Sequence, residues 1–525
     1  MRPSARNIAA IGVLLAWGAS VAWLAVRSGT RTESALLRSE ASLRLSPGDA
    51  WFQVMAGHAP LGIAGVTLDT LGSGYRVRET LTLDLPGISG VDRANRTTEF
   101  LMGPDLTLER IESQDGIVGF RRHLLVETDG TGWTTTLSRN GRVVARGTLA
   151  GSVPTSLALA PYRLALTGSL ADDAERDLTT VSGWPVVAGE GSYRVARDTM
   201  VVFADSAMQV GTGSVWAAAH FDSAAARTVL VRSAGGPLIM QVSLRGSLVG
   251  LEYPLGIRWV RTDFDLIVRA AGPGTMATNL TTLVPDLPVV RPWTGSGHRA
   301  DPADTVAAFL VTRRDGSRIG AERLELFAGE GIEYRRAAID GAPSGDMLVL
   351  GPFRQERAPS TPPPQDPLIQ ESDPSVVAFA DSFRTTTGTD FVRLSARLRR
   401  IRVDTAATAP IDAAGTLMAG HGRPDGLARL LVAVLHLHGW RARYVIGIAP
   451  IADTLFSHAW VEQWSPGDRQ WVGIEPSTLE PTPAGMIRLA TAGSSHPADM
   501  LPMVADVRFA RTLTDTLPAL EGTPQ

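Results

Sequence analysis

The stretch from Gly422 to Pro476 constrains the fold of this chain more than any other part of its sequence. Apolar residues recur there at the spacing of a helix that is buried along one face, at Leu427, Leu430, Leu431, Val434 and Leu435. Pro424 suits the first turn of this helix, where a missing N–H costs nothing. Gly439 is a natural helix end. The pattern therefore predicts a buried helix that begins at Pro424 and stops before Gly439.

Three strands are predicted after the helix, over residues 443–448, 458–464 and 470–474. With His458-Ala459-Trp460-Val461-Glu462 on the second strand and Glu475-Pro476 after the third, the stretch resembles the transglutaminase-like superfamily, the papain-related thiol fold. In that family a G-x-C turn presents a cysteine at a helix N-terminus, a strand carries H-A-W-x-E, and a last strand ends in D-P. Here Gly439 to Arg443 corresponds to the G-I-P-A-R-type segment, and Glu475-Pro476 replaces D-P.

The resemblance implies a papain-like α+β domain. In an active member Glu475 would orient the imidazole of His458, and His458 would deprotonate a thiol. Counted from Gly422, the nucleophile position is Pro424, and the whole chain contains no cysteine. A thiolate paired with histidine is how such a site generates a nucleophile at neutral pH. Proline has no side-chain group to offer, so thiol chemistry is excluded. We interpret His458 and Glu475 as a pair retained for structural reasons.

A second interpretation is that the protein is an enzyme that works without a thiol. Asp425, next to Pro424, could approach His458 and form with Glu475 a cluster that binds a metal or acts on water. Otherwise Asp425 complements the positive end of the helix. Ser457 is not expected to reach the site, because successive strand side chains point to opposite faces. Outside this alternative, no cofactor and no metal site is predicted.

The N-terminus carries an apolar run. Residues 7–26 hold no charge and follow Arg2 and Arg6. About 20 such residues can span a bilayer, and a positive N-terminus stays in the cytoplasm. We predict a transmembrane anchor or signal segment over residues 1–30, with the bulk of the protein periplasmic or on the cell surface. A cleavable signal peptide is the alternative, since Ser20-Val21-Ala22 fits a small-x-small cleavage site.

The remaining chain divides by pattern. Residues 44–270 alternate apolar and polar side chains, and Asn140-Gly141 is typical of a two-residue hairpin turn, so an antiparallel β-rich domain is predicted that could curl into a half-barrel. Residues 271–352 are interpreted as a connection with a further β-rich segment, and 353–366 as a proline-rich linker. The transglutaminase-like domain is assigned to 367–511 and a tail to 512–525.

Composition narrows the function. A net charge of −3 gives no reason to expect a nucleic-acid partner, and the absence of cysteine excludes disulfides. The predicted class is α+β, with an N-terminal membrane-spanning helix, antiparallel β-rich domains and the C-terminal domain. The predicted role is that of a membrane-anchored, envelope-exposed pseudoenzyme that binds or scaffolds an envelope protein or peptide. The alternative is a non-thiol amide hydrolase or amine-exchange enzyme that uses Asp425, His458 and Glu475.

Overall fold

The computed structural model describes nineteen separate stretches of this chain. They are residues 17, 33–87, 90–117, 120–128, 131–150, 160–171, 175–183, 186–211, 216–270, 307–313, 315–328, 332–339, 342–350, 365–386, 388–404, 409–451, 454–483, 485–491 and 503–512, with 17 standing alone. Within them the chain builds one large antiparallel sheet, a small four-stranded sheet, and a mixed helical and β unit near the C-terminal end.

The large sheet has fourteen strands in the order β8-β7-β6-β5-β4-β3-β2-β1-β14-β13-β12-β11-β10-β9. The bounds of its first eight strands are β1 Gly48–Ala56, β2 Ala59–Leu71, β3 Gly74–Gly87, β4 Gly90–Met102, β5 Leu108–Ile117, β6 Phe120–Thr128, β7 Gly132–Arg139 and β8 Arg142–Ala150. The other six are β9 Glu175–Gly183, β10 Val186–Gln209, β11 Trp216–Ser233, β12 Gly236–Ser243, β13 Leu248–Glu252 and β14 Arg258–Thr262. The pairing of β1 with β14 joins two runs of successive hairpins, so the first strand lies in the middle of the sheet.

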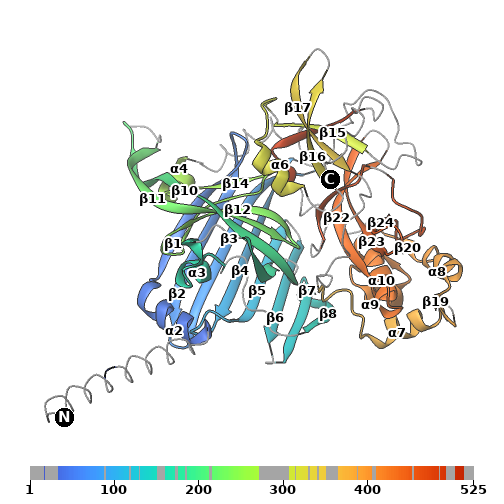
Figure 1. Ribbon diagram of the computed structural model, residues 1–525. Coiled ribbons are helices and arrows are strands. Elements are labelled where there is room, and N and C mark those ends of the chain that lie inside the picture. Colours follow the sequence, from blue (N-terminus) through green and yellow to red (C-terminus); the bar gives the residue numbers. More distant parts are fainter. Residues whose placement is uncertain are drawn as a thin grey trace, which may run out of the picture.

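The large sheet curls, so that β10 to β12 cross in front of β2 to β5 (Figure 1). Helix α3 (Ala160–Leu166) belongs to the cores of both halves: Tyr162 and Leu166 pack with the β1–β8 half, whereas Leu164 and Ala165 pack with β10 to β12. Helices α2 (Glu33–Arg44) and α4 (Phe264–Ala270) flank the sheet, and a short 3₁₀ helix covers Ser169–Ala171. The predicted β7–β8 hairpin is confirmed, with Asn140 and Gly141 both at positive φ.

The four-stranded sheet has the order β16-β17-β15-β26. Its strands are β15 Ala307–Arg313, β16 Ile332–Ile339, β17 Ala342–Leu350 and β26 Val507–Thr512, and helix α6 (Ala321–Phe327) packs in the same core. Strand β26 comes from the far end of the chain and pairs antiparallel with β15, with Phe309 opposite Arg511. The predicted domain limit at residue 511 therefore falls inside a strand of this sheet.

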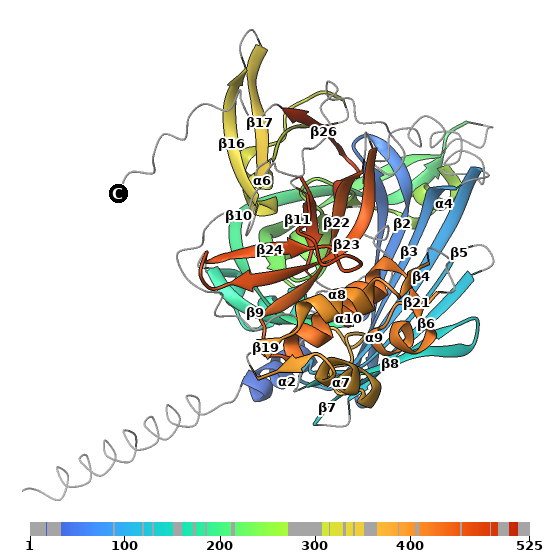
Figure 2. The same ribbon diagram turned by 90° about the vertical axis from the view of Figure 1, so that its right-hand side faces the viewer.

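The C-terminal unit places helices against one face of a sheet with the order β24-β23-β22-β25 (Figure 2). Its elements are α7 Pro374–Asp381, α8 Phe391–Leu398, α9 Ala413–Ala419, α10 Pro424–Leu437, β22 Ala442–Ile451, β23 Thr454–Ser465, β24 Gln470–Ile474 and β25 Ile487–Ala490. Two short pairs, β18 (Arg384–Thr385) with β19 (Gly388–Thr389) and β20 (Arg402–Val403) with β21 (His421–Gly422), complete it. Every residue of α10 from Asp425 to Leu435 is buried, which puts this helix at the centre of the core.

Two features of the predicted fold class are corrected. The described part of the chain is β-rich, with far more strand than helix, and is not α+β as a whole. The antiparallel strands predicted over residues 44–270 are present between residues 48 and 262, and they far outnumber the helices of the C-terminal unit, so the predicted class gave those helices too much weight. The N-terminal membrane-spanning helix is the second correction: no helix in the described part of the chain is long and apolar enough to cross a membrane. Residues 7–26, on which that prediction rested, lie outside the described residues apart from Trp17.

Candidate functional site

The turn before α10 is shaped by two glycines. A Cβ on Gly422 would lie 2.6 Å from both Cγ2 and Oγ1 of Thr416, and a Cβ on Gly426 would lie 2.3 Å from Oγ1. Both positions therefore exclude larger residues. Pro424 occupies the first turn of α10 and is half-buried, after Arg423 in an extended conformation. The hydroxyl of Thr416 packs against this turn, but the side chain is fully buried and out of reach of a substrate.

His458 and Glu475 lie together. His458 is in β23, where its partner on β22 is Gly447, and Glu475 follows the last residue of β24. His458 Nε2 and Glu475 Oε2 are 2.9 Å apart. An ionised carboxylate only accepts hydrogen bonds, so Nε2 is the donor. The other carboxylate oxygen, Oε1, accepts a hydrogen bond of 3.1 Å from Ser477 Oγ, and the Glu475 backbone N–H donates to Glu480 O.

The histidine–carboxylate pair is partly open to solvent, with side-chain exposures of 18% for His458 and 29% for Glu475. Among the described residues, Nδ1 of His458 has no hydrogen-bond partner. The neighbours Ala459 and Val461 pack in the core with α10, so His458 points toward the other side of β23. Gly447, opposite His458 on β22, is closely covered: a Cβ at this position would lie 2.1 Å from Ile487 O and 2.5 Å from the Trp460 ring.

Asp425 does not join this pair. Its carboxylate is fully buried, 3.1 Å from Arg423 Nε and 3.7 Å from Arg429 Nη1. Burial raises the pKa of Asp425, and the two guanidinium groups oppose that rise. No hydrogen bond or ion pair in the described part of the chain connects Asp425 to His458 or Glu475. The predicted three-residue cluster is therefore split into two, and the described residues contain no group of three ligands suited to a metal.

Sequence reasoning missed the buried charge network around Arg429. Arg429 Nε donates to Asp366 Oδ2 at 2.8 Å and Nη1 donates to Ile411 O at 2.9 Å. The guanidinium also lies 4.4 Å from the centre of the Tyr444 ring. Burial by itself would lower the pKa of Arg429. Asp366, Tyr444 and Asp425 raise it by more than burial lowers it, so the net shift is upward and the group stays charged. An arginine within an otherwise apolar helix face was the available signal, because a buried charge needs a partner.

A second buried charge network involves two residues of the family motifs, Glu462 and Arg443. Glu462, the last residue of H-A-W-x-E, lies 2.6 Å from Arg443 Nη2 and 3.1 Å from Arg488 Nη1. Burial raises the pKa of Glu462, but the two arginines reverse the effect and hold it below its usual value. The Arg443 guanidinium lies 4.0 Å from the centre of the Trp471 ring. Glu462 and Arg443 are thus cross-links within the sheet.

The large sheet also reaches this unit. Arg139 of β7 donates from Nη1 to Ala409 O at 3.4 Å, and Gln370 Nε2 donates to Arg146 O at 2.5 Å. Burial, together with the positive charges of Arg423 and Arg122, lowers the pKa of Arg139 to about 10. The start of α10 is therefore electrostatically coupled to a strand of the other domain.

A groove of about 720 Å³ lies between α8, α10 and the end of β24. Leu431 and Leu435 of α10 line it together with Ile474, the residue before Glu475. On α8, Phe391 and Val392 line the groove while remaining 37% and 82% exposed. Exposed aliphatic and aromatic side chains around a concave surface are typical of a protein-binding or ligand-binding site.

A comparison with protein families assigns this part of the chain to a known superfamily. Residues 378–476 match the family model described as the transglutaminase-like superfamily, and this range contains Pro424, His458 and Glu475. The chain therefore carries a transglutaminase-like domain, as the motif predicted, and that domain has no cysteine. No curated protein matches the chain.

Three solved structures are similar to parts of the chain. A β-barrel-like protein of a domain of unknown function from Brucella abortus is 13% identical, with a TM-score of 0.31, and covers 42% of this chain and 97% of its own. A candidate cysteine protease from Cytophaga hutchinsonii is 14% identical, with a TM-score of 0.21, over 40% of this chain and 83% of its own. A protein from Pseudomonas aeruginosa, from another family of unknown function, is 11% identical, with a TM-score of 0.22, over 35% and 87%.

Proposed function

We propose that the transglutaminase-like domain is catalytically inactive and that the protein acts as a binding or scaffolding module. The observation that carries this proposal is Pro424 in the first turn of α10, at the position where the family motif has its cysteine, in a chain without cysteine. A proline side chain has neither a nucleophile nor a proton to exchange.

The neighbouring polar groups do not replace the missing thiol. Asp425 is fully buried and paired with Arg423 and Arg429, and Thr416 is fully buried. The His458–Glu475 hydrogen bond serves the sheet, because removal of either partner would leave a partly buried polar group unsatisfied. These contacts support the proposal that the residues of the former active site now stabilise the fold and do not take part in catalysis.

The proposed binding surface is the groove between α8, α10 and β24. Its proposed occupant is an extended segment of a partner protein with an apolar side chain over Leu431 and Leu435. Polar groups at the rim suit a polypeptide: Ser395 Oγ and Arg399 Nη2 both reach Thr478 O, at 3.1 and 3.4 Å. The charge-free run at residues 7–26 behind two arginines favours a place of action outside the cytoplasm.

The first experiment measures turnover. The purified protein and its His458→Ala variant are assayed for amide hydrolysis and amine exchange, with and without divalent cations. We expect no turnover from either protein. A steady rate that is lost in His458→Ala would overturn the proposal and favour the non-thiol enzyme.

A second experiment places a cysteine at position 424, where the family motif has its nucleophile. Pro424→Cys introduces the only thiol of the chain, so its alkylation by iodoacetamide can be followed without background. A helix N-terminus lowers the pKa of a cysteine to about 3.5–7.5 in place of about 8.5, and a histidine within reach adds to this effect. After allowance for the weaker nucleophilicity of low-pKa thiolates, we expect alkylation at pH 6 to be about tenfold faster than for an ordinary cysteine.

Pro374→Cys is the matched control, because Pro374 also occupies the first turn of a helix, α7. The double variant Pro424→Cys with His458→Ala separates the histidine from the helix end. Equal rates in Pro424→Cys, Pro374→Cys and the double variant would show that position 424 does not meet His458.

The groove is tested with a peptide display library. Val392→Asp should abolish selection of apolar peptides, whereas Val403→Asp, at a 47% exposed position on β20 that does not line the groove, should not. Equal selection by all three proteins would contradict binding in the groove.

A further inference from the structure

A second cavity lies in the large β-sheet domain, away from the transglutaminase-like unit. It has a volume of about 500 Å³ and opens where the end of α2, the start of β1, α3 and the turn between β12 and β13 meet. Its lining combines arginine side chains with apolar residues from β2. Small-molecule sites typically have about 300–1,000 Å³ and a few placed polar groups on an apolar surface.

The charged lining is mainly positive. Arg44, Arg245 and Arg261 line the cavity, and Asp49 is the one carboxylate among the lining residues. Arg245 is exposed and, within the described residues, has no carboxylate partner. Arg44 reaches Glu40 only at 3.5 Å.

Arg261 is held in an apolar setting. Its guanidinium lies 4.2 Å from the centre of the Phe203 ring, and no hydrogen bond to it is present within the described residues. Burial lowers the pKa of Arg261, with Asp222 acting against this effect. A half-buried guanidinium without hydrogen bonds is poorly solvated, so an anion at this point would supply the missing partner.

The floor of the cavity is apolar, with one polar atom. Val66 and Leu68 are buried side chains of β2, and Leu248 of β13 lies beside them. Tyr162 of α3 is only 8% exposed and also lines the cavity. Its hydroxyl has no hydrogen-bond partner in the described part of the chain, and burial raises its pKa to about 12, so it remains a donor at neutral pH.

We propose that this cavity binds a single-chain anionic amphiphile. The head group, a carboxylate or a phosphate, contacts Arg245 and Arg261 and accepts a hydrogen bond from Tyr162, and the alkyl chain lies on Val66 and Leu68. The volume suits one alkyl chain, whereas a two-chain lipid would extend beyond the cavity.

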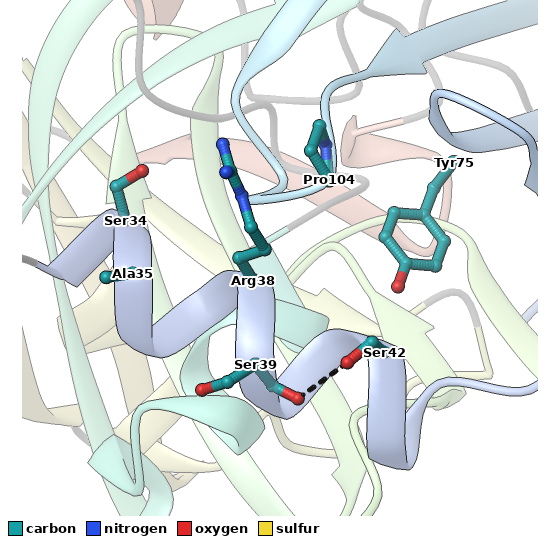
Figure 3. A pocket seen from close by; sticks show the side chains of 7 residues that line it. All are labelled: Ser34, Ala35, Arg38, Ser39, Ser42, Tyr75 and Pro104. Carbon is teal, nitrogen blue, oxygen red and sulfur yellow. Dashed lines mark hydrogen bonds between the residues drawn. The ribbon is translucent and has the colours of Figure 1, made fainter.

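A neighbouring cavity provides the contrast. It lies on the other part of α2, has about 530 Å³, and is lined by Ser34, Ala35, Arg38, Ser39, Ser42, Tyr75 and Pro104 (Figure 3). Arg38 extends between Ser34 and Pro104, with serine hydroxyls along the helix (Figure 3). That cavity has one arginine and no aliphatic floor, so it should not hold an alkyl chain. Arg38→Gln is therefore a control for the loss of an arginine charge at a nearby cavity that lacks an aliphatic floor.

The test is calorimetric titration of the full chain with dodecanoate, dodecyl phosphate, dodecanol and inorganic phosphate, each below its aggregation concentration. We expect both anionic amphiphiles to bind, with the difference between them identifying the preferred head group. Dodecanol and inorganic phosphate should each bind at least tenfold more weakly. Each methylene removed from the alkyl chain should weaken binding by up to about fourfold.

The double variant Arg245→Gln with Arg261→Gln should reduce the affinity for dodecanoate at least tenfold, whereas Arg38→Gln should leave it unchanged. Ser247→Trp fills the cavity without removing an arginine and should also abolish binding, which keeps the test valid if the double variant folds poorly. Absence of binding by the wild type, binding that neither variant changes, or equal binding of inorganic phosphate alone would overturn the proposal.

Discussion

Asp366→Asn perturbs the buried charges beneath α10. Arg423 and Arg429 carry two positive charges, and Asp366 and Asp425 carry two negative ones, so the group is neutral as it stands. Asparagine keeps the shape of Asp366 but leaves one positive charge without a counterion. It also has a single carbonyl oxygen for two donors, since Asp366 accepts from both Leu368 N–H and Arg429 Nε.

The expected cost is large because nothing can rehydrate Arg429. Its side chain is 0% exposed, and after the substitution only the weaker influence of Asp425 at 3.7 Å and of Asp412 is known to oppose its charge. Removal of one partner from a buried ion pair costs about 3–5 kcal/mol. The asparagine carbonyl can still accept a hydrogen bond, so we expect the lower end, about 3 kcal/mol.

The assay is amide hydrogen exchange of α10, because a chain of several domains does not unfold in a single transition. A loss of about 3 kcal/mol in opening free energy corresponds to exchange about 150-fold faster in Asp366→Asn. Glu480→Gln is the control: Glu480 and Arg399 form an ion pair at 3.4 Å with side chains 68% and 56% exposed. Such surface pairs contribute about 0–1 kcal/mol, so exchange should change little.

The double variant Asp366→Leu with Arg429→Met removes one charge of each sign and should regain most of the lost protection. If α10 in Asp366→Asn exchanged within about threefold of wild type, the conclusion that the substitution leaves a buried positive charge uncompensated would be wrong.

Three further predictions concern stability. Gly447→Ala should destabilise the C-terminal unit by about 1–3 kcal/mol, since the new methyl group meets Ile487 O and the Trp460 ring; an unchanged melting temperature would contradict the contacts. His458→Ala should cost about 1 kcal/mol in urea unfolding, because the bond to Glu475 is partly exposed, and a loss above 3 kcal/mol would refute that assessment. Burial, opposed by Arg96, raises the pKa of Glu79 to about 7, so the folded state retains a proton that the unfolded chain releases near pH 4.5. The resulting stability is present below pH 4.5 and lost as the pH rises through about 7; Glu79→Gln should flatten this decline in urea midpoints measured from pH 4.5 to 8, and parallel curves would contradict it.

Local signals in the sequence predicted local structure well. Pro424 marked the start of α10. Aspartate is a favoured helix N-cap, and Asp373, Asp390 and Asp412 cap three other helices by accepting hydrogen bonds from the Ser375, Arg393 and Gly415 N–H groups. The proximity of His458 and Glu475 also follows from the hairpin pairing of β23 with β24.

Long-range structure left no such signal. The pairing of β1 with β14 joins residues 51–55 to residues 258–262, and alternation along each strand cannot specify that register. The predicted linker 353–366 ends in Asp366, which the sequence alone presents as a loop residue but which is buried against Arg429. Asp425 looked available for chemistry although Arg423 stands two residues before it and Arg429 four residues after it on the predicted helix; that local pairing could have been predicted, whereas the complete burial of Asp425 could not.

The pairing of β15 with β26 has a consequence for folding during synthesis. Because β26 covers the outer edge of β15, that edge stays open on the ribosome until residues 507–512 have emerged. The whole transglutaminase-like unit must be made during this interval. A stop codon just before Val507 would therefore expose a hydrogen-bonding edge to other nascent chains, and we expect aggregation of the product where a simple trimmed tail would be harmless.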